Sequence, residues 1–307
     1  MLDPKHKSSY IKGMNKLPLD KRVQILHMLC EGSSMRSIAR VADISFNTVA
    51  KLLIDAGKVC AIFHDDTVRD VESRRVQVDE IWSFVYAKQK NVATAKRLDL
   101  AYGDVWTWTA IDADSKLILS YLVGGRDSDY AIAFMDDLRS RLANRVQLTS
   151  DGHRAYLEAV EGAFGGDIDY AMLVKMYGVG PDSTKGRYSP AECIGTRKRQ
   201  IEGDPDPKHV STSYAERQNL TMRMHMRRFT RLTNAFSKKF ENHAHMVALY
   251  TVWYNFVKQH KSLKGISPAM AAGVTDTLWD MKDVAALVDA AAPKPGRRGS
   301  YKKTNSN

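Results

Sequence analysis

The stretch that decides the fold is Val76-Gln-Val-Asp-Glu-Ile-Trp-Ser-Phe-Val85. It is rich in β-branched and aromatic residues and apolar almost throughout, a composition typical of a strand buried on both faces. Asp79 and Glu80 lie inside this run, where a carboxylate is costly unless a metal ion or a buried arginine compensates it. Because side chains alternate between the two faces of a strand, we expect Glu80 to point away from Asp79. Only one of the two acids then serves a given site.

Further strand and helix patterns follow this run. The predicted strands cover residues 76–85, 105–111, 117–123, 145–150 and 169–174, and the predicted helices cover 129–142 and a stretch around 156–164. Turn residues at 112–115 join the second strand to the third as a hairpin. The order β-β-β-α-β-α-β-α is that of an RNase-H-like domain, with the first strand central and the fourth beside it. The sequence therefore predicts an α/β fold with a mixed five-stranded sheet.

A second acid, Asp151, comes directly after the fourth predicted strand and is followed by Gly152. Ligands of open α/β sheets bind just past the carboxyl ends of the strands, and a glycine allows close backbone approach. An ordinary Asp-Gly turn is the alternative interpretation. If the first and fourth strands are neighbours, Asp151 and Asp79 lie close together.

A third acid lies in Ser213-Tyr-Ala-Glu-Arg-Gln-Asn-Leu-Thr-Met-Arg223, which opens a helical pattern that continues to about His260. Positions i, i+3, i+7 and i+11 share one helix face. The residues in this row are Glu216, Asn219, Arg223 and Arg227. A carboxylate beside guanidinium groups suits a site where a metal ion meets a phosphate backbone. A solvated face with ion pairs is the alternative.

The charge of the chain points to a polyanionic partner. The formal net charge is +11, and the helical pattern after residue 213 is loaded with cations, which is hard to explain without such a partner. The candidate DNA-contacting residues of this part are Arg217, Asn219, Arg223, Arg227, Arg228 and Arg231.

The amino-terminal part is predicted to form three short helices between residues 15 and 60. Asp20, Ser34 and Ser45 are candidate N-caps, and a tight turn at 42–44 separates the last two helices. This arrangement resembles a helix-turn-helix of the DNA-binding kind. The residues expected to face outward as base and phosphate readers are Ser45, Asn47, Thr48 and Lys51. A three-helix packing module is the alternative.

These patterns predict a domain organisation. We expect a flexible tail at 1–14, a helix-turn-helix domain at 15–62, a linker at 63–73, a catalytic domain at 74–264 with an insertion loop at 178–210, a C-terminal helical segment at 265–292, and a basic disordered tail at 293–307.

The composition also indicates the compartment. The three cysteines are isolated, so neither a zinc ribbon nor a disulfide framework is indicated. The first residues have no apolar signal core, and the longest apolar run falls short of the ~20 residues that span a bilayer. We expect a protein of the bacterial cytoplasm, bound to nucleoid DNA, with no membrane association.

Several blocks together resemble transposases of the IS-one insertion-sequence family. The blocks are Val78–Val85, Val105–Trp108, Leu148–Gly152, Ala215–Arg223 and Arg231–Ser237, in the same order, over roughly residues 70 to 262. Members of that family commonly begin with a zinc-ribbon segment, and this chain lacks the cysteines for one. The helix-turn-helix must then recognise the element ends alone, unless another chain helps.

The resemblance implies a catalytic mechanism. Asp79, Asp151 and Glu216 match the acidic catalytic triad of the family, and Arg217, Asn219 and Arg223 match its polar residues after the glutamate. Three carboxylates can hold two Mg²⁺ ions ~3.5–4 Å apart, with Mn²⁺ as a substitute. The expected activity is cleavage at the element end to give a 3′-OH, followed by joining of that end to target DNA.

The expected partners are double-stranded DNA, at the element ends and at the target, and further copies of the chain. Both ends must be paired, so a homodimer or a larger homo-oligomer is expected. Two alternatives stay open: an RNase-H-like endonuclease without strand transfer, and a non-catalytic DNA-binding regulator. Asp104 is a candidate fourth acid, with an exposed aspartate at a strand start as the alternative.

Overall fold

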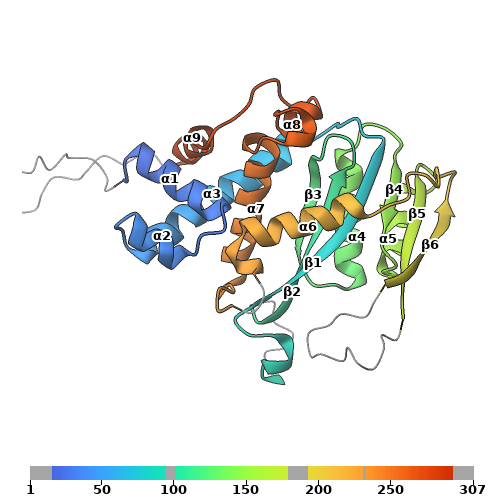
Figure 1. Cartoon of the computed structure of the whole chain (residues 1–307), viewed down its shortest axis with the longest axis horizontal. Coiled ribbons are helices and arrows are strands. Elements are labelled where there is room, and N and C mark those ends of the chain that lie inside the picture. The colour runs from blue at the N-terminus through green and yellow to red at the C-terminus, as the bar shows by residue number, and fades with distance from the viewer. Residues whose placement is uncertain (1–15, 95–100, 179–192, 231–232, 293–307) are drawn as a thin grey trace, which may run out of the picture.

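The computed structural model describes residues 16–94, 101–178, 193–230 and 233–292. These residues form a mixed α/β structure around a six-stranded sheet with the strand order β3-β2-β1-β4-β5-β6 (Figure 1). The strands are β1 (Arg75–Val85), β2 (Gly103–Asp112), β3 (Ile118–Gly124), β4 (Gln147–Ser150), β5 (Asp169–Tyr177) and β6 (Cys193–Glu202). Pairs β1/β4 and β4/β5 are parallel, and the other three pairs are antiparallel. The architecture is compatible with an RNase-H-like fold, and β1 is central with β4 beside it, as predicted.

The helices surround this sheet and extend to one side of it. They are α1 (Leu19–Cys30), α2 (Met35–Val41), α3 (Phe46–Thr67), α4 (Ser128–Arg141), α5 (Ala155–Phe164), α6 (Ser213–His225), α7 (Phe240–Val252), α8 (Pro268–Ala271) and α9 (Met281–Ala291). Short 3₁₀ turns lie at Gln89–Asn91, Arg227–Phe229 and Lys261–Leu263, and a π-helical turn at Trp253–Val257 continues α7. In the part of the chain that the structure covers, no helix is long and apolar enough to cross a membrane.

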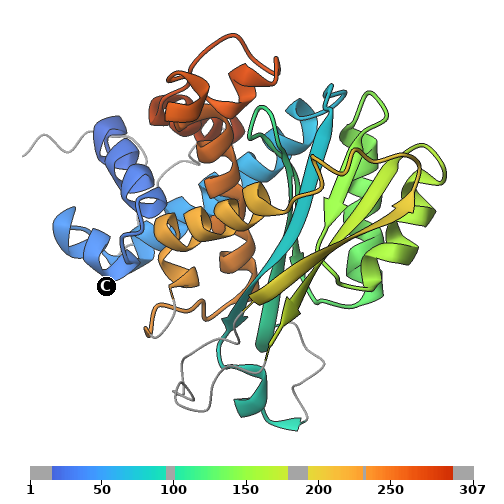
Figure 2. The same ribbon diagram turned by 45° about the vertical axis from the view of Figure 1, so that its right-hand side comes forward.

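Side chains on the two faces of the sheet contact different helices. Trp108 of β2 packs between Phe134 of α4 and Tyr156 of α5. On the opposite face, the Gln77 side chain of β1 accepts a hydrogen bond from the backbone of Tyr214 in α6. Helices α4 and α5 therefore cover one face, and α6 and α7 lie against the other (Figure 2). This alternation makes β1 a nearly continuous buried run, because both of its faces are covered.

The sheet has one strand more than predicted. Strand β6 lies inside the segment 178–210, which was expected to be a loop, and it pairs with β5 over residues 170–177. The prediction failed because β6 is exposed along almost its whole length and its side chains are mostly polar. Such a strand has no apolar alternation, and pairing with the more buried β5 determines its conformation.

The helical pattern predicted to run from Ser213 to about His260 is also interrupted. Helix α6 ends at His225, Met226 is extended, and α7 begins only at Phe240. No glycine or proline lies between residues 226 and 239 to signal a break. Met226 and Phe229 are both buried, so the burial of these side chains accompanies the turn.

The three amino-terminal helices form where they were predicted. Ser34 and Ser45 cap α2 and α3 by accepting backbone N–H groups, which confirms two of the three predicted caps. The third was wrong: α1 begins at Leu19 with Pro18 as its N-cap, and Asp20 lies in its first turn. Helix α3 continues through the first five residues of the predicted linker, to Thr67.

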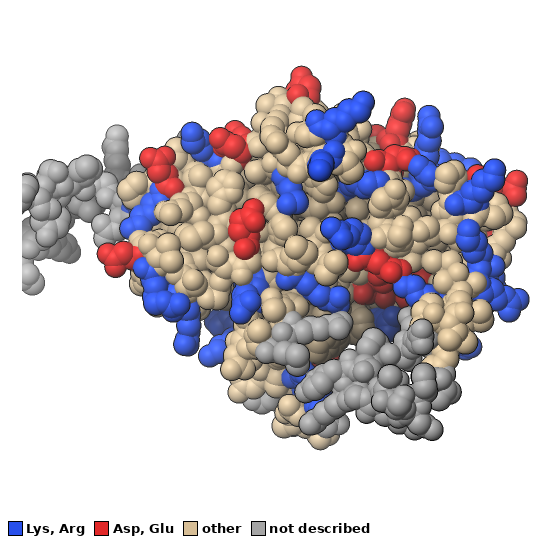
Figure 3. Space-filling model, in the orientation of Figure 1, with Lys and Arg blue, Asp and Glu red and all other residues tan. Residues whose placement is uncertain are grey.

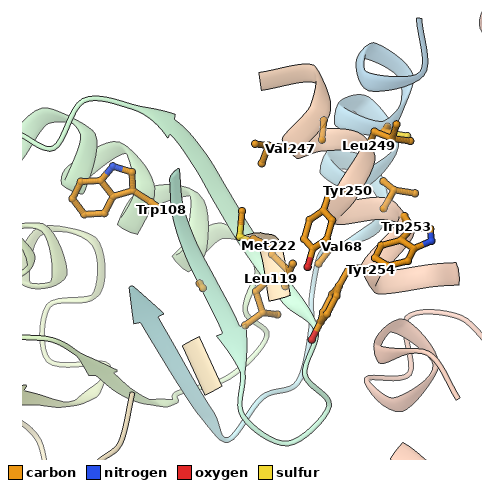
Figure 4. Close-up of a cluster of buried hydrophobic side chains, with 14 of the residues drawn as sticks. Val68, Trp108, Leu119, Met222, Val247, Leu249, Tyr250, Trp253 and Tyr254 are labelled. Atoms are coloured by element: carbon orange, nitrogen blue, oxygen red, sulfur yellow. The ribbon is translucent and has the colours of Figure 1, made fainter. Parts of the chain in front are cut away.

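Helix α3 connects the amino-terminal helices α1 and α2 to the rest of the fold. A Cβ added at Gly57 would lie 2.4 Å from the Cβ of His245, so only glycine permits this close approach of α3 to α7. Beyond the end of α3, Val68 packs with Met222, Tyr250 and Leu119, which come from α6, α7 and β3 (Figure 4). The hydrophobic core is therefore continuous from the first three helices to the sheet.

Side-chain hydrogen bonds attach helix α7 and its π-helical extension to the sheet, and the Ser83 hydroxyl of β1 shares one with Nε2 of His243 in α7 at 3.1 Å. Asn255 accepts a hydrogen bond from the backbone N–H of Ile118 and donates one to the backbone oxygen of the same residue, each at 2.9 Å. At the other end of the molecule, Arg22 of α1 donates two hydrogen bonds to Asp289 of α9, at 2.6 and 3.0 Å. These contacts attach the end of α7 to the sheet and α9 to the amino-terminal helix α1.

Candidate active site

Two of the predicted acids meet where β4 ends beside the middle of β1. The parallel pairing of β1 with β4 aligns Gln77 with Thr149, so Asp79 and Asp151, each two residues further along, reach the same level of the sheet. Carboxylate oxygens of Asp79, Glu80 and Asp151 lie within 4.8 Å of one another. We call these three residues the acid group.

The presence of Glu80 in this group contradicts the expectation that only one of Asp79 and Glu80 serves the site. Its side chain does lie on the α5 face, where Trp108 is its neighbour on β2. However, β4 ends at Ser150, so no strand closes the edge of β1 beside Glu80. The longer glutamate side chain reaches this open edge, and its carboxylate lies beside the other two.

In the acid group Glu80 is buried, Asp79 and Asp151 are half-buried, and the three carboxylates repel one another. Burial raises the pKa of Asp79 to about 6, and the nearby charge of Asp151 acts in the same direction. Burial, again with the charge of Asp151, raises the pKa of Glu80 to about 7. Two cations oppose this effect: Arg126 donates a hydrogen bond to Oε2 of Glu80 at 3.2 Å, and the charge of Lys175 acts to lower the pKa of Asp79. The acid group therefore carries more negative charge than its described neighbours neutralise.

The third predicted acid, Glu216, lies beside the acid group but outside it. It is in the first turn of α6, where its Oε1 accepts hydrogen bonds from Lys175 and from the Thr212 hydroxyl, both at 2.6 Å. Partial burial opposes ionisation, but these two donors lower the pKa of Glu216. Its charge is close enough to raise the pKa of Asp79.

One turn after Glu216, the helix contacts the acid group directly. Asn219 donates a hydrogen bond from Nδ2 to Oδ2 of Asp79 at 2.8 Å. Its Oδ1 is buried and has no hydrogen-bond partner among the described residues. Helix α6 thus presents Glu216 and Asn219 on one face, as the spacing predicted. Arg223 is half-buried on the same helix, and Arg227 lies beyond it in a 3₁₀ turn.

The other candidate DNA-contacting residues of this region differ in accessibility. Arg217 and Arg227 are exposed. The guanidinium of Arg228 instead donates to the Ser237 hydroxyl at 3.1 Å and to the backbone oxygen of Asn242, and burial lowers its pKa to about 10. Arg228 therefore holds the chain between α6 and α7 in place, and its contact with DNA stays a prediction. Arg231 lies outside the described residues.

The predicted reading residues lie at the start of α3. Ser45, Asn47 and Lys51 are exposed, and Thr48 is half-buried. The Ser45 hydroxyl accepts the backbone N–H of Thr48 at 3.1 Å as the helix cap, and Lys51 pairs with Asp55. Of the four residues, Asn47 is the one whose side chain has no hydrogen bond or ion pair within the described part of the chain.

Asp104 is not a further member of the acid group. It lies at the start of β2, opposite Phe84, and its Oδ1 accepts the backbone N–H of Gln89 at 3.0 Å. The alternative interpretation of an ordinary aspartate at a strand start is the better one.

Two basic residues beside the acids were not predicted. Lys175 lies one residue past the predicted end of the fifth strand, and Arg126 follows the glycines at the end of β3. A lysine continuing an apolar strand was a detectable signal for the first. Nothing in the local pattern singles out Arg126. Figure 3 shows acidic side chains gathered in the region where α6 meets the sheet, with lysines and arginines around them.

Comparison with known proteins adds little to this geometry. No protein-family model matches the sequence, and no curated protein matches it. Among solved structures, the chain is similar to the piggyBac transposase in a synaptic complex with hairpin DNA, at 9% sequence identity and a TM-score of 0.35, over 91% of this chain and 73% of that one. At this TM-score the likeness supports neither a shared fold nor a shared function.

Proposed function

We propose that this protein is a DNA transposase of the DDE type, with Asp79, Asp151 and Glu216 as its catalytic acids. The observation that carries the proposal is the acid group, in which buried or half-buried carboxylates from β1 and from the end of β4 converge beside Glu216 and Asn219 of α6. The net charge of +11 fits a DNA substrate.

The residues present fit divalent metal ions. Mg²⁺ takes oxygen ligands at about 2.1 Å in octahedral geometry, which places neighbouring ligand oxygens about 3–4 Å apart. The oxygens of the acid group lie within 4.8 Å of one another, so a small contraction suffices. The raised pKa values of Asp79 and Glu80 also indicate that a cation would stabilise this group. Mg²⁺ or Mn²⁺, when bound, would act as a Lewis acid at the phosphate and lower the pKa of a bound water.

In this proposal, Asp79 and Asp151 are the principal ligands, and Glu80 is a further carboxylate at the same edge. Asn219 holds Asp79 in orientation through its hydrogen bond to Oδ2. Glu216 completes the set, held in place by Lys175 and Thr212. Arg126, which is 37% exposed, is placed to bind a neighbouring phosphate.

Two displacements at phosphorus account for the reaction. In the first, a water oxygen bonds to phosphorus and the P–O3′ bond breaks, so that the element end is left with a 3′-OH and the flanking strand with a 5′-phosphate. In the second, the oxygen of that 3′-OH bonds to a phosphorus of target DNA, and the target P–O3′ bond breaks. The number of phosphodiester bonds does not change in the second step, so no nucleotide cofactor is consumed.

DNA recognition is assigned to two regions. The start of α3, with Ser45, Asn47, Thr48 and Lys51, is proposed to bind the element ends. Arg217, Arg223 and Arg227 are proposed to bind the phosphate backbone near the acids. Because two ends must be brought together, we propose that a homodimer or larger homo-oligomer is the active form.

The experiment that tests this function uses a labelled duplex with the terminal sequence of the element that carries the gene, a supercoiled target and Mg²⁺. The wild type should join the end to the target. Asp79→Asn, Asp151→Asn and Glu216→Gln should bind DNA but not react, and Asp104→Asn, the matched control, should react normally. Cleavage without joining would favour an endonuclease. Binding with no reaction in Mg²⁺ or Mn²⁺ would favour a non-catalytic regulator.

A further inference from the structure

Beyond the acid group, β1 carries a row of aromatic side chains that the proposed chemistry does not use. Trp82 and Phe84 follow Glu80 at alternate positions, so all three lie on one face of the strand. The ring centroids of Trp82 and Phe84 are 5.7 Å apart, and Phe236 lies 5.0 Å from Phe84. We call Trp82, Phe84 and Phe236 the aromatic row.

The aromatic row lines a pocket of about 580 Å³. The pocket lies between β1 and the segment that follows α6, which runs beside the end of β1 through a bridge between Val85 and Ser237. The other lining residues that matter here are Phe229, Lys88 and Asn234. None of the described residues that line the pocket is acidic.

The pocket is close to the acid group and connected to it by a cation. Two residues of strand separate Glu80 from Trp82, a distance of about 7 Å. Arg126 spans this interval: it bonds to Glu80, and its guanidinium lies 4.4 Å from the ring centroid of Trp106. Trp106 is the neighbour of Trp82 on β2. A carboxylate group, a guanidinium and a series of aromatic rings therefore follow one another along β1.

The aromatic row is not a closed packing cluster. Trp82, Phe84 and Phe236 are each half-buried, whereas Trp108, on the same face and nearer the middle of the sheet, is fully buried. The Lys88 ammonium lies 5.7 Å from the ring centroid of Trp82, and Lys88 and Asn234 are exposed at the pocket. The pocket thus offers flat aromatic surface, a cation and an amide to a ligand.

This combination matches one class of ligand. Unstacked nucleobases bind to aromatic faces, and the adjoining phosphates bind to cations. A base inside a duplex is stacked on both sides, so the ligand must be an unpaired base. We infer that the pocket binds an unpaired nucleobase of the DNA strand whose phosphate lies at the acid group. In this form the inference rests on the proposed function, because that function places the phosphate.

The test measures binding by the full-length protein in EDTA, so that no reaction is required. The probes are a labelled oligothymidylate and a strand of equal length in which abasic sugar-phosphates replace the nucleosides. The wild type should bind the oligothymidylate more tightly. Trp82→Leu and Phe236→Leu, which keep apolar volume but remove a flat ring, should each reduce this preference roughly fivefold or more. Their affinity for the abasic strand should be unchanged, and Trp82→Phe should retain most of the preference.

The matched control is Tyr86→Leu, since Tyr86 is 56% exposed one residue past β1 and does not line the pocket. It should leave the preference intact. If Trp82→Leu does not fold, Phe236→Leu decides the result. Equal binding of both probes by the wild type, or an equal loss in Tyr86→Leu, would overturn the inference. A wild type that shows the preference but joins no DNA ends would retain the pocket as a nucleobase site and overturn only the proposed function.

Discussion

Charged side chains are buried in two regions of this molecule, with opposite surroundings. On α4, Arg141 donates hydrogen bonds to Asp137 at 2.7 and 2.8 Å, to Asp65 at 2.8 Å and to the backbone oxygen of Val68 at 3.1 Å. These contacts lower the pKa of Asp137 despite its burial. In the acid group, carboxylates face carboxylates, and the pKa values of Asp79 and Glu80 are raised.

This difference separates a structural role from a functional one. The Arg141 network compensates its own charges, so its removal should affect folding and leave the chemistry intact. The acid group carries uncompensated negative charge, which should lower the free energy of unfolding. A group that destabilises the fold in this way is typical of a site that binds a ligand.

The largest effect is expected from Asp79→Asn or Asp151→Asn. Each should lower strand-transfer activity roughly a thousandfold or more, because a catalytic group is lost. Without metal at neutral pH, Asp79→Asn should also raise the free energy of unfolding, by about 1–3 kcal/mol, because the folded pKa of about 6 shows that the fold disfavours this charge. Activity assays and urea unfolding measure the two effects. A loss of both activity and stability would show that Asp79 has a structural role.

Asp137→Asn should instead lower stability and leave activity intact. It leaves the buried guanidinium of Arg141 with Asp65 as its remaining ionic partner, so the free energy of unfolding should fall by about 3 kcal/mol. Activity below the unfolding temperature should be nearly normal. Asp167→Asn is the matched control, because its pairs with Arg139 and Arg145 are exposed and should contribute less than about 1 kcal/mol. Equal losses of unfolding free energy in the two variants would show that the buried ion pair stabilises the fold no more than the surface pairs do.

The Arg141 region should also give stability a dependence on pH. Burial lowers the pKa of His64 to about 4, and the neighbouring charge of Arg141 acts in the same direction. The unfolded chain binds this proton near pH 6.5, so stability should fall as the pH falls from 6.5 to 4. For this residue the loss should approach about 2–3 kcal/mol.

His64→Gln should remove that part of the pH dependence, measured by urea unfolding at several pH values. His27 is exposed, so His27→Gln is the control and should keep the pH dependence of the wild type. Asp65 and Asp137 also face His64 and act in the opposite direction. An unchanged slope in His64→Gln would mean that His64 is protonated in the folded protein.

The smallest effect is expected beside the acid group, from Lys175→Gln. The ammonium of Lys175 lowers the pKa of Glu216, so its loss should raise that pKa and move the acid limb of the activity profile to higher pH. We expect activity at neutral pH to fall about tenfold, the effect typical of removing a residue that orients a ligand. Lys198→Gln, on the exposed strand β6, should leave the profile unchanged. An unshifted profile in Lys175→Gln would show that Lys175 does not act on Glu216.

The sequence predicted the parts of the site that follow from strand order. The order of strands and helices, which is that of an RNase-H-like domain, placed β1 beside β4, and this neighbourhood brings Asp79 to Asp151. The helical spacing likewise placed Glu216 and Asn219 on one face of α6. The first prediction depends on the order of the elements, and the second depends on periodicity within a single helix, which the chain displays directly.

The missed features depend on contacts between elements. Glu80 joins the acid group because β4 stops at Ser150, and no local pattern fixes the length of a parallel pair. Helix α6 ends at His225 without a breaker, alongside the burial of Met226 and Phe229. Strand β6 is polar and takes its conformation from β5. Each case is a tertiary contact that overrides a local preference.

Mn²⁺ titration followed by electron paramagnetic resonance shows whether the acid group holds the divalent metal that phosphodiester chemistry requires. The wild type, with duplex DNA present, should bind Mn²⁺, and Mg²⁺ should compete for the same site. Asp79→Asn and Asp151→Asn should weaken this binding at least tenfold, whereas Asp104→Asn and Asp137→Asn should not change it. Equal Mn²⁺ binding by all five proteins, or none by the wild type, would contradict the account.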